Sequence, residues 1–158
     1  MNTICCRDRG NSMEYKTIIC PVDGSELSMR AEETGAYISK ISGAKLILLY
    51  VVEKWYRSAD VITDSKEWKA IHEGWLNEGR ELLEKEKKRL EGNGVKDIET
   101  ALKDGDAAHE IVALAVERNA DIIVMATHRY SPVGKLFMGS VTDKVTRHSP
   151  CPVLWIFK

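Results

Sequence analysis

The sequence predicts an α/β domain: an open, five-stranded parallel sheet with helices on both faces. Three observations support this fold class. Apolar segments of strand length alternate with amphipathic segments of helix length, the strand segments are almost unbroken apolar runs, and turn residues follow several of them. Unbroken apolar runs are typical of parallel strands that are covered on both faces. Because right-handed crossovers between parallel strands place helices on each face, this order of elements indicates a doubly wound sheet.

The first part of the chain contains a strand, a helix and a second strand. The run YKTIICPVD starts at Tyr15, is apolar and β-branched, and ends in turn residues at 23–25. A series of side chains between residues 27 and 41, the last of them Ile41, falls on one face at helical spacing. Gly43 comes after it and is a natural C-terminal cap. The apolar run AKLILLYVVE then predicts the second strand.

A long helix and a third strand come next. Residues 54–65 show no clear period, whereas the large apolar side chains of residues 75–90 suggest a long amphipathic helix that ends at the glycine-rich residues 92–94. The third strand covers roughly residues 98–102 and leads to Gly105 and Asp106.

The last part of the chain completes the alternating pattern. Apolar residues from Ala108 onward repeat at the spacing of a helix, and ADIIVMAT predicts the fourth strand. A loop over residues 128–138 precedes a short helix from Ser140, where Ser140 and Asp143 have the spacing of a capping box. Pro150 ends this helix, and PVLWIF forms the fifth strand.

Chain length and charge limit the classes to which this protein can belong. The chain has 158 residues, enough for one domain with a core and too few for two ordinary domains. Its 23 basic side chains nearly cancel its 24 acidic ones, so no general field attracts nucleic acid or anionic lipid. We interpret the charged run at residues 84–91, EKEKKRLE, as a solvated helix face.

Cysteine use and hydropathy predict a cytoplasmic protein. The four cysteines fit no zinc or redox motif, and Cys20, inside an apolar run, is expected to be a small core residue in a reducing compartment. No apolar stretch is long enough to span a membrane. Residues 1–13 precede the periodic sequence and lack the apolar core of a secretory signal. We expect them to be a flexible extension, or the product of a start codon assigned too far upstream, followed by one domain over residues 14–158.

Ligands of doubly wound folds bind at the carboxyl ends of the strands, which directs attention to the loops after Asp23, Val51, Gly105 and Met125. Gly139-Ser140 places a small residue and a hydroxyl at a helix N-terminus, where free amides and the helix dipole favour a phosphate. The alternative is that this pair is only a turn and a cap. The sequence contains no Walker loop, HExxH or GxSxG motif and no evident pair of nucleophile and base.

These segments resemble the universal stress protein family over residues 15–158. The resemblance rests on IICPVDGSE, LILLYVVE, GDAAHEIVALA, and IIVMATHR followed by GSVTDKVTRHSPCPVLWI. It implies a Rossmann-like sheet of the adenine nucleotide α-hydrolase type, with strand order 3-2-1-4-5. It also implies an adenine nucleotide, ATP or AMP, with Mg²⁺ as the companion of a triphosphate, and a homodimer formed through the last strand.

By the same resemblance, the nucleotide would contact residues at three strand ends and one helix start. Pro21, Val22 and Asp23 would border adenine and ribose, and Val51 would offer backbone atoms to the base. Asp23 is equally well explained as a turn residue. The remaining residues would lie near ribose and phosphates: Met125, Ala126, His128, Arg129, Gly139, Ser140, Val141 and Thr142.

Two positions depart from the family pattern. Nucleotide-binding members resemble G-x2-G-x9-G-[ST], and here Ala126 and Arg129 replace the first two glycines while Gly139 and Ser140 keep the third position and the hydroxyl. Arg129 has two interpretations. Its side chain could occupy the space of a phosphate, or its guanidinium could bind one.

Three functions follow from these observations. The first is a nucleotide-binding sensor or switch in a stress response, with at most slow ATP hydrolysis. The second is a nucleotide-free dimeric scaffold of the same fold, paired through residues 153–157. An enzyme such as a nucleotide hydrolase ranks last, because no general base or nucleophile is evident.

Overall fold

The computed structural model describes residues 14–53, 66–127 and 139–157. The predicted extension at 1–13, the aperiodic segment at 54–65 and the loop at 128–138 lie outside the described residues.

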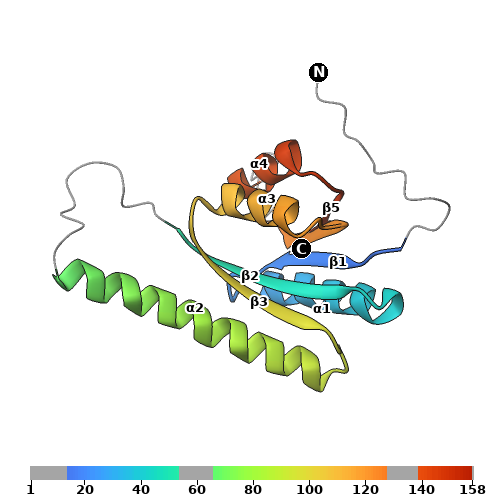
Figure 1. The fold of residues 1–158 in the computed structure, drawn as a ribbon, viewed down its shortest axis with the longest axis horizontal. Helices are drawn as coiled ribbons and strands as arrows, with labels where there is room; N and C mark the ends of the chain where they lie inside the picture. The colour runs from blue at the N-terminus through green and yellow to red at the C-terminus, as the bar shows by residue number, and fades with distance from the viewer. Residues whose placement is uncertain (1–13, 54–65, 128–138, 158) are drawn as a thin grey trace.

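Five parallel strands alternate with four helices in the described chain (Figure 1). The strand order is β3-β2-β1-β4-β5, which confirms the predicted fold class and strand order. In chain order, the elements are β1 (Thr17–Pro21), α1 (Glu26–Ser42), β2 (Lys45–Glu53), α2 (Lys66–Gly92), β3 (Ile98–Gly105), α3 (Ala107–Glu117), β4 (Ile122–Ala126), α4 (Ser140–His148) and β5 (Val153–Ile156).

The sheet separates two hydrophobic clusters. Helices α1 and α2 cover one face, and α3 and α4 cover the other (Figure 1). Alternate residues of each strand supply the two clusters, so that Ile18 and Cys20 pack on the side of α1 and α2 while Ile19 packs on the side of α3 and α4. Cys20 is fully buried, which confirms that it is a core residue.

Side chains cap two of the helices. The Ser25 hydroxyl accepts the backbone N–H of Ser28 at the start of α1, and the Asp106 carboxylate accepts that of His109 at the start of α3. Gly43 ends α1 in the left-handed conformation, with φ of 72°, as its position after the helical pattern predicted.

The predicted capping box at α4 is wrong. The N-cap residue is Gly139, one position earlier than the box requires, and no side chain caps this helix. Ser140 is therefore the first helical residue. The Asp143 carboxylate accepts from Arg147 Nε, one turn later in the same helix, at 2.9 and 3.0 Å.

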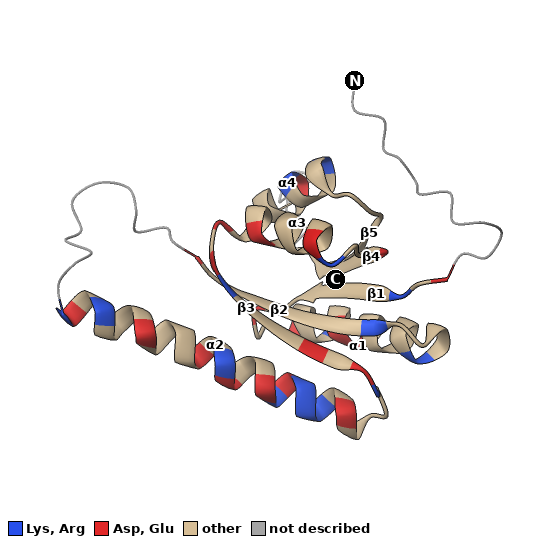
Figure 2. Ribbon diagram, in the orientation of Figure 1, with Lys and Arg blue, Asp and Glu red and all other residues tan. Residues whose placement is uncertain are grey.

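The sequence pattern misplaces two helical side chains, Ile41 of α1 and Glu86 of α2. Ile41 shares the predicted apolar face of α1, yet 67% of it is exposed. The run at residues 84–91 is not wholly solvated, because Glu86 is only 2% exposed. The rest of α2 carries both signs of charge along its length (Figure 2), as expected for a solvated face.

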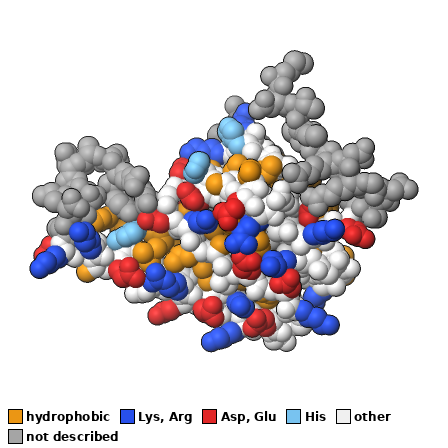
Figure 3. Space-filling view, viewed as in Figure 1, with side chains coloured by type: hydrophobic (Ala, Val, Ile, Leu, Met, Phe, Trp, Pro, Cys, Tyr) orange, Lys and Arg blue, Asp and Glu red, His pale blue; other side chains and the backbone are white. Residues whose placement is uncertain are grey.

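The visible surface is mixed in charge. In Figure 3, basic and acidic side chains alternate across the face shown without a large area of one sign. Among the described helices, none combines the length and the hydropathy that crossing a membrane requires.

Candidate functional site

A cavity of about 400 Å³ opens at the carboxyl ends of β1, β2 and β4, beside the start of α4. This is the edge of the sheet at which doubly wound folds bind ligands. Its lining residues are Pro21, Val22, Asp23, Ser28, Leu49, Tyr50, Val51, Glu53, Ala107, Ile111, Met125, Ala126, Thr127, Gly139, Ser140, Val141 and Thr142. Most of these side chains are apolar, so the cavity combines an apolar wall with a few polar groups, as small-molecule sites usually do.

The end of β1 supplies a carboxylate that has a structural role as well. Asp23 Oδ1 accepts the backbone N–H of Ser25 at 2.8 Å, a turn that positions the capping serine of α1. Asp23 is exposed and also lines the cavity. The two interpretations of Asp23 are therefore compatible, since a carboxylate has a second oxygen that can accept from a ligand.

The start of α4 presents free backbone donors to the cavity. The first hydrogen bond of the helix runs from the Asp143 N–H to the Gly139 carbonyl at 2.9 Å. The N–H groups of Ser140, Val141 and Thr142 precede it and find no acceptor among the described residues. These three amides, with the positive end of the helix dipole, form a potential anion site.

Thr127 lies next to this helix start. It follows β4 directly, its backbone N–H donates to the Ile156 carbonyl at 2.9 Å, and the residue is part of the cavity lining. The residue is 3% exposed, and its hydroxyl has no hydrogen-bond partner among the described residues. A buried hydroxyl without a partner is uncommon in folded proteins.

Tyr50 adds a phenol to the cavity wall. Burial, with smaller contributions from the negative charges of Glu78 and Asp23, raises the pKa of Tyr50 above its ordinary value. Its hydroxyl therefore stays protonated at neutral pH and can donate a hydrogen bond.

Ser28 connects the cavity to a buried charge cluster, formed by Glu32, Glu86 and Arg89. The Ser28 hydroxyl accepts the Asp23 N–H at 3.3 Å and donates to Glu32 Oε1 at 3.2 Å. Arg89 donates to Glu32 Oε2 at 2.7 Å and to Glu86 Oε2 at 2.6 Å. Two buried carboxylates thus share one guanidinium directly behind the turn at Asp23.

This arrangement shifts the ionisation of Glu32. Burial and the neighbouring Glu86 charge raise the pKa of Glu32 to about 7, against the smaller opposing effect of Arg89. The cluster therefore changes its charge near neutral pH.

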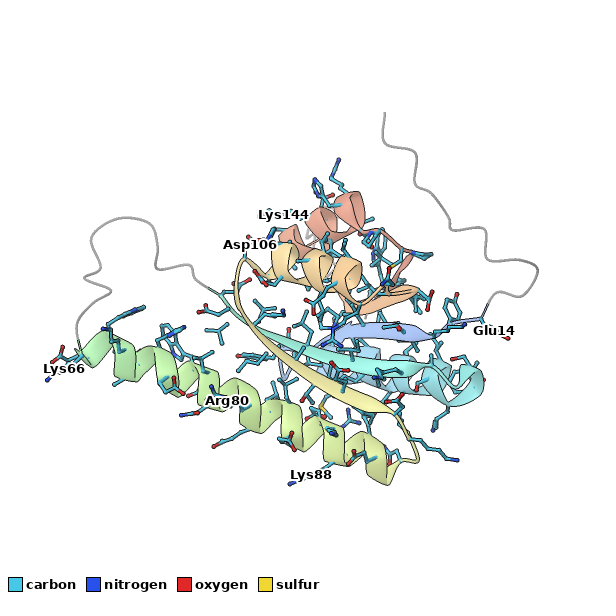
Figure 4. All side chains as sticks on the ribbon, viewed as in Figure 1. Glu14, Lys66, Arg80, Lys88, Asp106 and Lys144 are labelled. Atoms are coloured by element: carbon cyan, nitrogen blue, oxygen red, sulfur yellow. The ribbon has the colours of Figure 1, made fainter. Side chains whose placement is uncertain are left out.

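A side-chain contact links α3 to α4. Figure 4 labels Asp106, the N-cap residue of α3, and Lys144 of α4, which lie next to each other. Lys144 Nζ donates to Asp106 Oδ2 at 3.4 Å. Both side chains are exposed, so we expect this contact to orient α4 against α3 while contributing little stability.

The structure brings together the predicted site residues that it describes. Pro21, Val22, Asp23, Val51, Met125, Ala126, Gly139, Ser140, Val141 and Thr142 all line the cavity. His128 and Arg129 lie outside the described residues.

Several lining residues were missed. Ser28 and Ile111 lie one turn into α1 and α3; the helical repeat made Ile111 a core residue, and Ser28 belonged to no predicted pattern. Thr127 closed the apolar run ADIIVMAT and was assigned to the strand. A polar residue at the end of an apolar run was the available signal for Thr127, because strand ends form the ligand edge of such sheets.

A second cavity, of about 500 Å³, lies at the opposite edge, where β1 and β2 begin. Its lining includes the charged side chains of Lys16, Lys45, Asp97 and Arg118. The amino ends of parallel strands are not the usual ligand edge, so we do not assign the functional site there. In the described ranges, neither edge gathers three His, Cys, Asp or Glu side chains to hold a metal ion.

Comparison with known proteins identifies relatives of this chain. The family model described as the universal stress protein family matches residues 14–156. A universal stress protein of Methanocaldococcus jannaschii is 37% identical over 145 residues, which cover 91% of this chain and 83% of the relative.

Solved structures share the same fold. The universal stress protein UspA from Lactobacillus plantarum has a TM-score of 0.78 at 22% identity, over 92% of this chain and 99% of the other. A universal stress protein in complex with cAMP has a TM-score of 0.64 at 24% identity, over 91% and 98% of the two chains. The universal stress protein from Archaeoglobus fulgidus in complex with dAMP also has a TM-score of 0.64, at 19% identity, over 92% and 99%. The family match over nearly the whole chain, with a relative above 30% identity, shows that this chain belongs to the universal stress protein family.

Proposed function

We propose that this protein binds an adenine nucleotide in the strand-end cavity and acts as a nucleotide-dependent sensor or switch in the cytoplasmic stress response. The observation that carries the proposal is the start of α4, where three backbone N–H groups without acceptors in the described chain border an apolar cavity. An apolar wall suits a planar base, and free amides at a helix N-terminus suit a phosphate.

The ligand class is supported by two relatives. One solved universal stress protein contains cAMP and another contains dAMP. Both ligands combine adenine, a sugar and a single phosphate group. AMP is therefore the first nucleotide to test on this chain, and ATP with Mg²⁺ is the second.

The cavity suggests how AMP would lie. Pro21, Val22 and the backbone of Val51 would contact the base, and the Asp23 carboxylate would accept from the ribose hydroxyls. Residues 139–142 would receive the phosphate at the helix start. No described residue supplies an evident nucleophile, so binding rather than catalysis is the proposed activity.

A second candidate is a nucleotide-free homodimeric scaffold. The edge strand β5 favours it, because β5 pairs only with β4 in the described sheet and leaves its other side open. Leu154 and Phe157 there are 37% and 48% exposed. A symmetric partner would cover these side chains and pair the open strand edge in either function.

Native mass spectrometry of the purified full chain tests both candidates in one spectrum. For the nucleotide-binding function, we expect a bound mass that matches an adenine nucleotide, its release on denaturation, and saturable binding of AMP by calorimetry. A dimer without bound nucleotide and without measurable binding of AMP or Mg²⁺-ATP would instead favour the scaffold.

A further inference from the structure

Among the described residues that line the cavity, Thr127 is the one whose buried side-chain hydroxyl has no hydrogen-bond partner. Thr127 is 3% exposed and its hydroxyl oxygen has no partner among the described residues. Leaving a buried hydroxyl unpaired destabilises the folded state, so such groups are usually retained for another role.

Thr127 is close to the free amides of α4. Gly139 has no side chain, and a methyl group at that position would lie 4.0 Å from Thr127 Oγ1 and 3.9 Å from Thr142 Oγ1. The space in front of the helix start is therefore bordered by hydroxyl-bearing side chains of two elements. The end of β4 supplies one and α4 supplies the other.

We propose that the Thr127 hydroxyl is a specificity-determining ligand contact that donates a hydrogen bond to the phosphate group bound at the start of α4. This inference rests on the proposed nucleotide binding and assigns a role to a position that the family's glycine pattern leaves unspecified. A hydroxyl donor and three backbone amides on adjacent elements would surround one anionic group from two sides. The role predicts discrimination between a phosphorylated nucleoside and the free nucleoside.

Replacement of Thr127 by valine removes the hydroxyl and keeps the shape of the side chain. Loss of a hydrogen bond to a charged group should weaken AMP binding by about 10- to 100-fold, whereas adenosine binding should be unchanged. The ligand-free T127V protein should melt no lower than the wild type, because no partner of the hydroxyl is lost. T127S retains the donor and should bind AMP within a few-fold of the wild type.

Thr146, in α4, provides a matched control. Its hydroxyl donates to the Thr142 carbonyl at 2.7 Å and accepts from Trp155 Nε1 at 3.2 Å, and it does not line the cavity. We expect T146V to lower the melting temperature and leave AMP affinity unchanged. That is the opposite of the pattern expected for T127V.

Calorimetry with AMP and adenosine, and thermal unfolding of each ligand-free variant, distinguish the outcomes. Wild-type affinity of T127V for AMP, an equal loss for adenosine, or a clear drop in the melting temperature of ligand-free T127V would each overturn the role of Thr127 and leave the proposed function standing. A wild-type protein that binds neither AMP nor ATP would overturn the proposed function itself.

Discussion

Gly139 shows how one residue without a side chain can leave the start of a helix uncapped. Its φ of −55° and ψ of 146° are open to any amino acid, so glycine is not needed there for the backbone conformation. The neighbouring Thr142 and Thr127 hydroxyls leave room for a small side chain. The consequence of glycine at this position is an uncapped helix, because Ser, Asp or Asn would satisfy the amides from within the protein.

Gly139→Asp should therefore separate stability from binding. The new carboxylate would cap α4 and interact with the helix dipole, so we expect the free energy of unfolding to rise by a few tenths to about 1 kcal/mol. The same carboxylate would occupy the anion position and repel phosphate, so AMP binding should fall by at least about 100-fold. Urea unfolding and calorimetry measure the two effects.

Gly139→Asn is the control for charge. Asparagine caps a helix about as well as aspartate but carries no charge, so its effect on AMP binding should be clearly smaller. If both variants bound AMP as tightly as the wild type, the phosphate would not lie at this helix start.

At the scale of elements, the close packing of α2 on the sheet depends on another glycine. A methyl group at Gly79 would lie 2.6 Å from Tyr50 Cδ1 on β2 and 2.8 Å from Leu102 Cδ1 on β3. The helix approaches the sheet closely at this point, and Tyr50 belongs to the cavity wall. The residue at position 79 therefore affects both the packing of α2 on the sheet and, through Tyr50, the shape of the cavity.

Gly79→Ala should destabilise the protein although alanine is the better helix former. Overpacking against Tyr50 and Leu102 costs about 1–3 kcal/mol, which exceeds the gain of about 1 kcal/mol in helix propensity. Gly74, in the same helix, is exposed and has no atom within 4 Å of such a methyl group, so Gly74→Ala should stabilise by about 0.5–1 kcal/mol. Urea midpoints test the pair, and equal shifts in both variants would contradict the close approach.

At the scale of the whole molecule, the buried charge cluster joins α1 to α2 behind the cavity. Glu32 is fully buried, and the groups that face it are Ser28 on α1, Glu86 and Arg89 on α2, and the thiol of Cys20 on β1. Burial, followed by the nearby Glu32 charge, raises the pKa of the Cys20 thiol well above its usual value. The pKa of Glu32, raised to about 7, lets this carboxyl change its ionisation near neutral pH.

The cluster should make stability depend on pH. Because the pKa of Glu32 is about 7 in the folded protein and near 4.5 in the unfolded chain, the folded state holds an extra proton between these values. The contribution of Glu32 to the free energy of unfolding therefore falls as pH rises from about 4.5 to 7, by at most about 1.4 kcal/mol per pH unit.

Glu32→Gln removes this titration and keeps a hydrogen-bonding side chain. Relative to the wild type, E32Q should gain stability steadily between about pH 5 and pH 7.5 in urea unfolding experiments. Glu33→Gln is the control, because Glu33 is on the same helix but exposed, and its unfolding curve should keep the wild-type pH dependence. Parallel stability profiles for E32Q and the wild type would refute the role of Glu32.

Much of the candidate site could be predicted from strand ends. Asp23, Val51 and Met125 lie where apolar runs stop, and Gly139 opens the last helix, so a parallel sheet must bring them to one edge. Ser28 and Tyr50 gave no such signal. Their position at the cavity depends on which side of the first turn of α1, and of the end of β2, faces the cavity, and periodicity does not fix that.

The sequence by itself determined the order of elements, the parallel sheet and the edge at which the cavity lies. These properties follow from the spacing of apolar residues within each segment and from the right-handedness of crossovers between parallel strands. Both can be inferred from short stretches of sequence. Only the tertiary structure decided that Glu86, within a charged run, is buried, and that Glu32 pairs with Arg89, 57 residues away. It also decided that α4 begins uncapped beside the Thr127 hydroxyl. The burial and pairing of a polar group depend on distant parts of the chain, which no local pattern specifies.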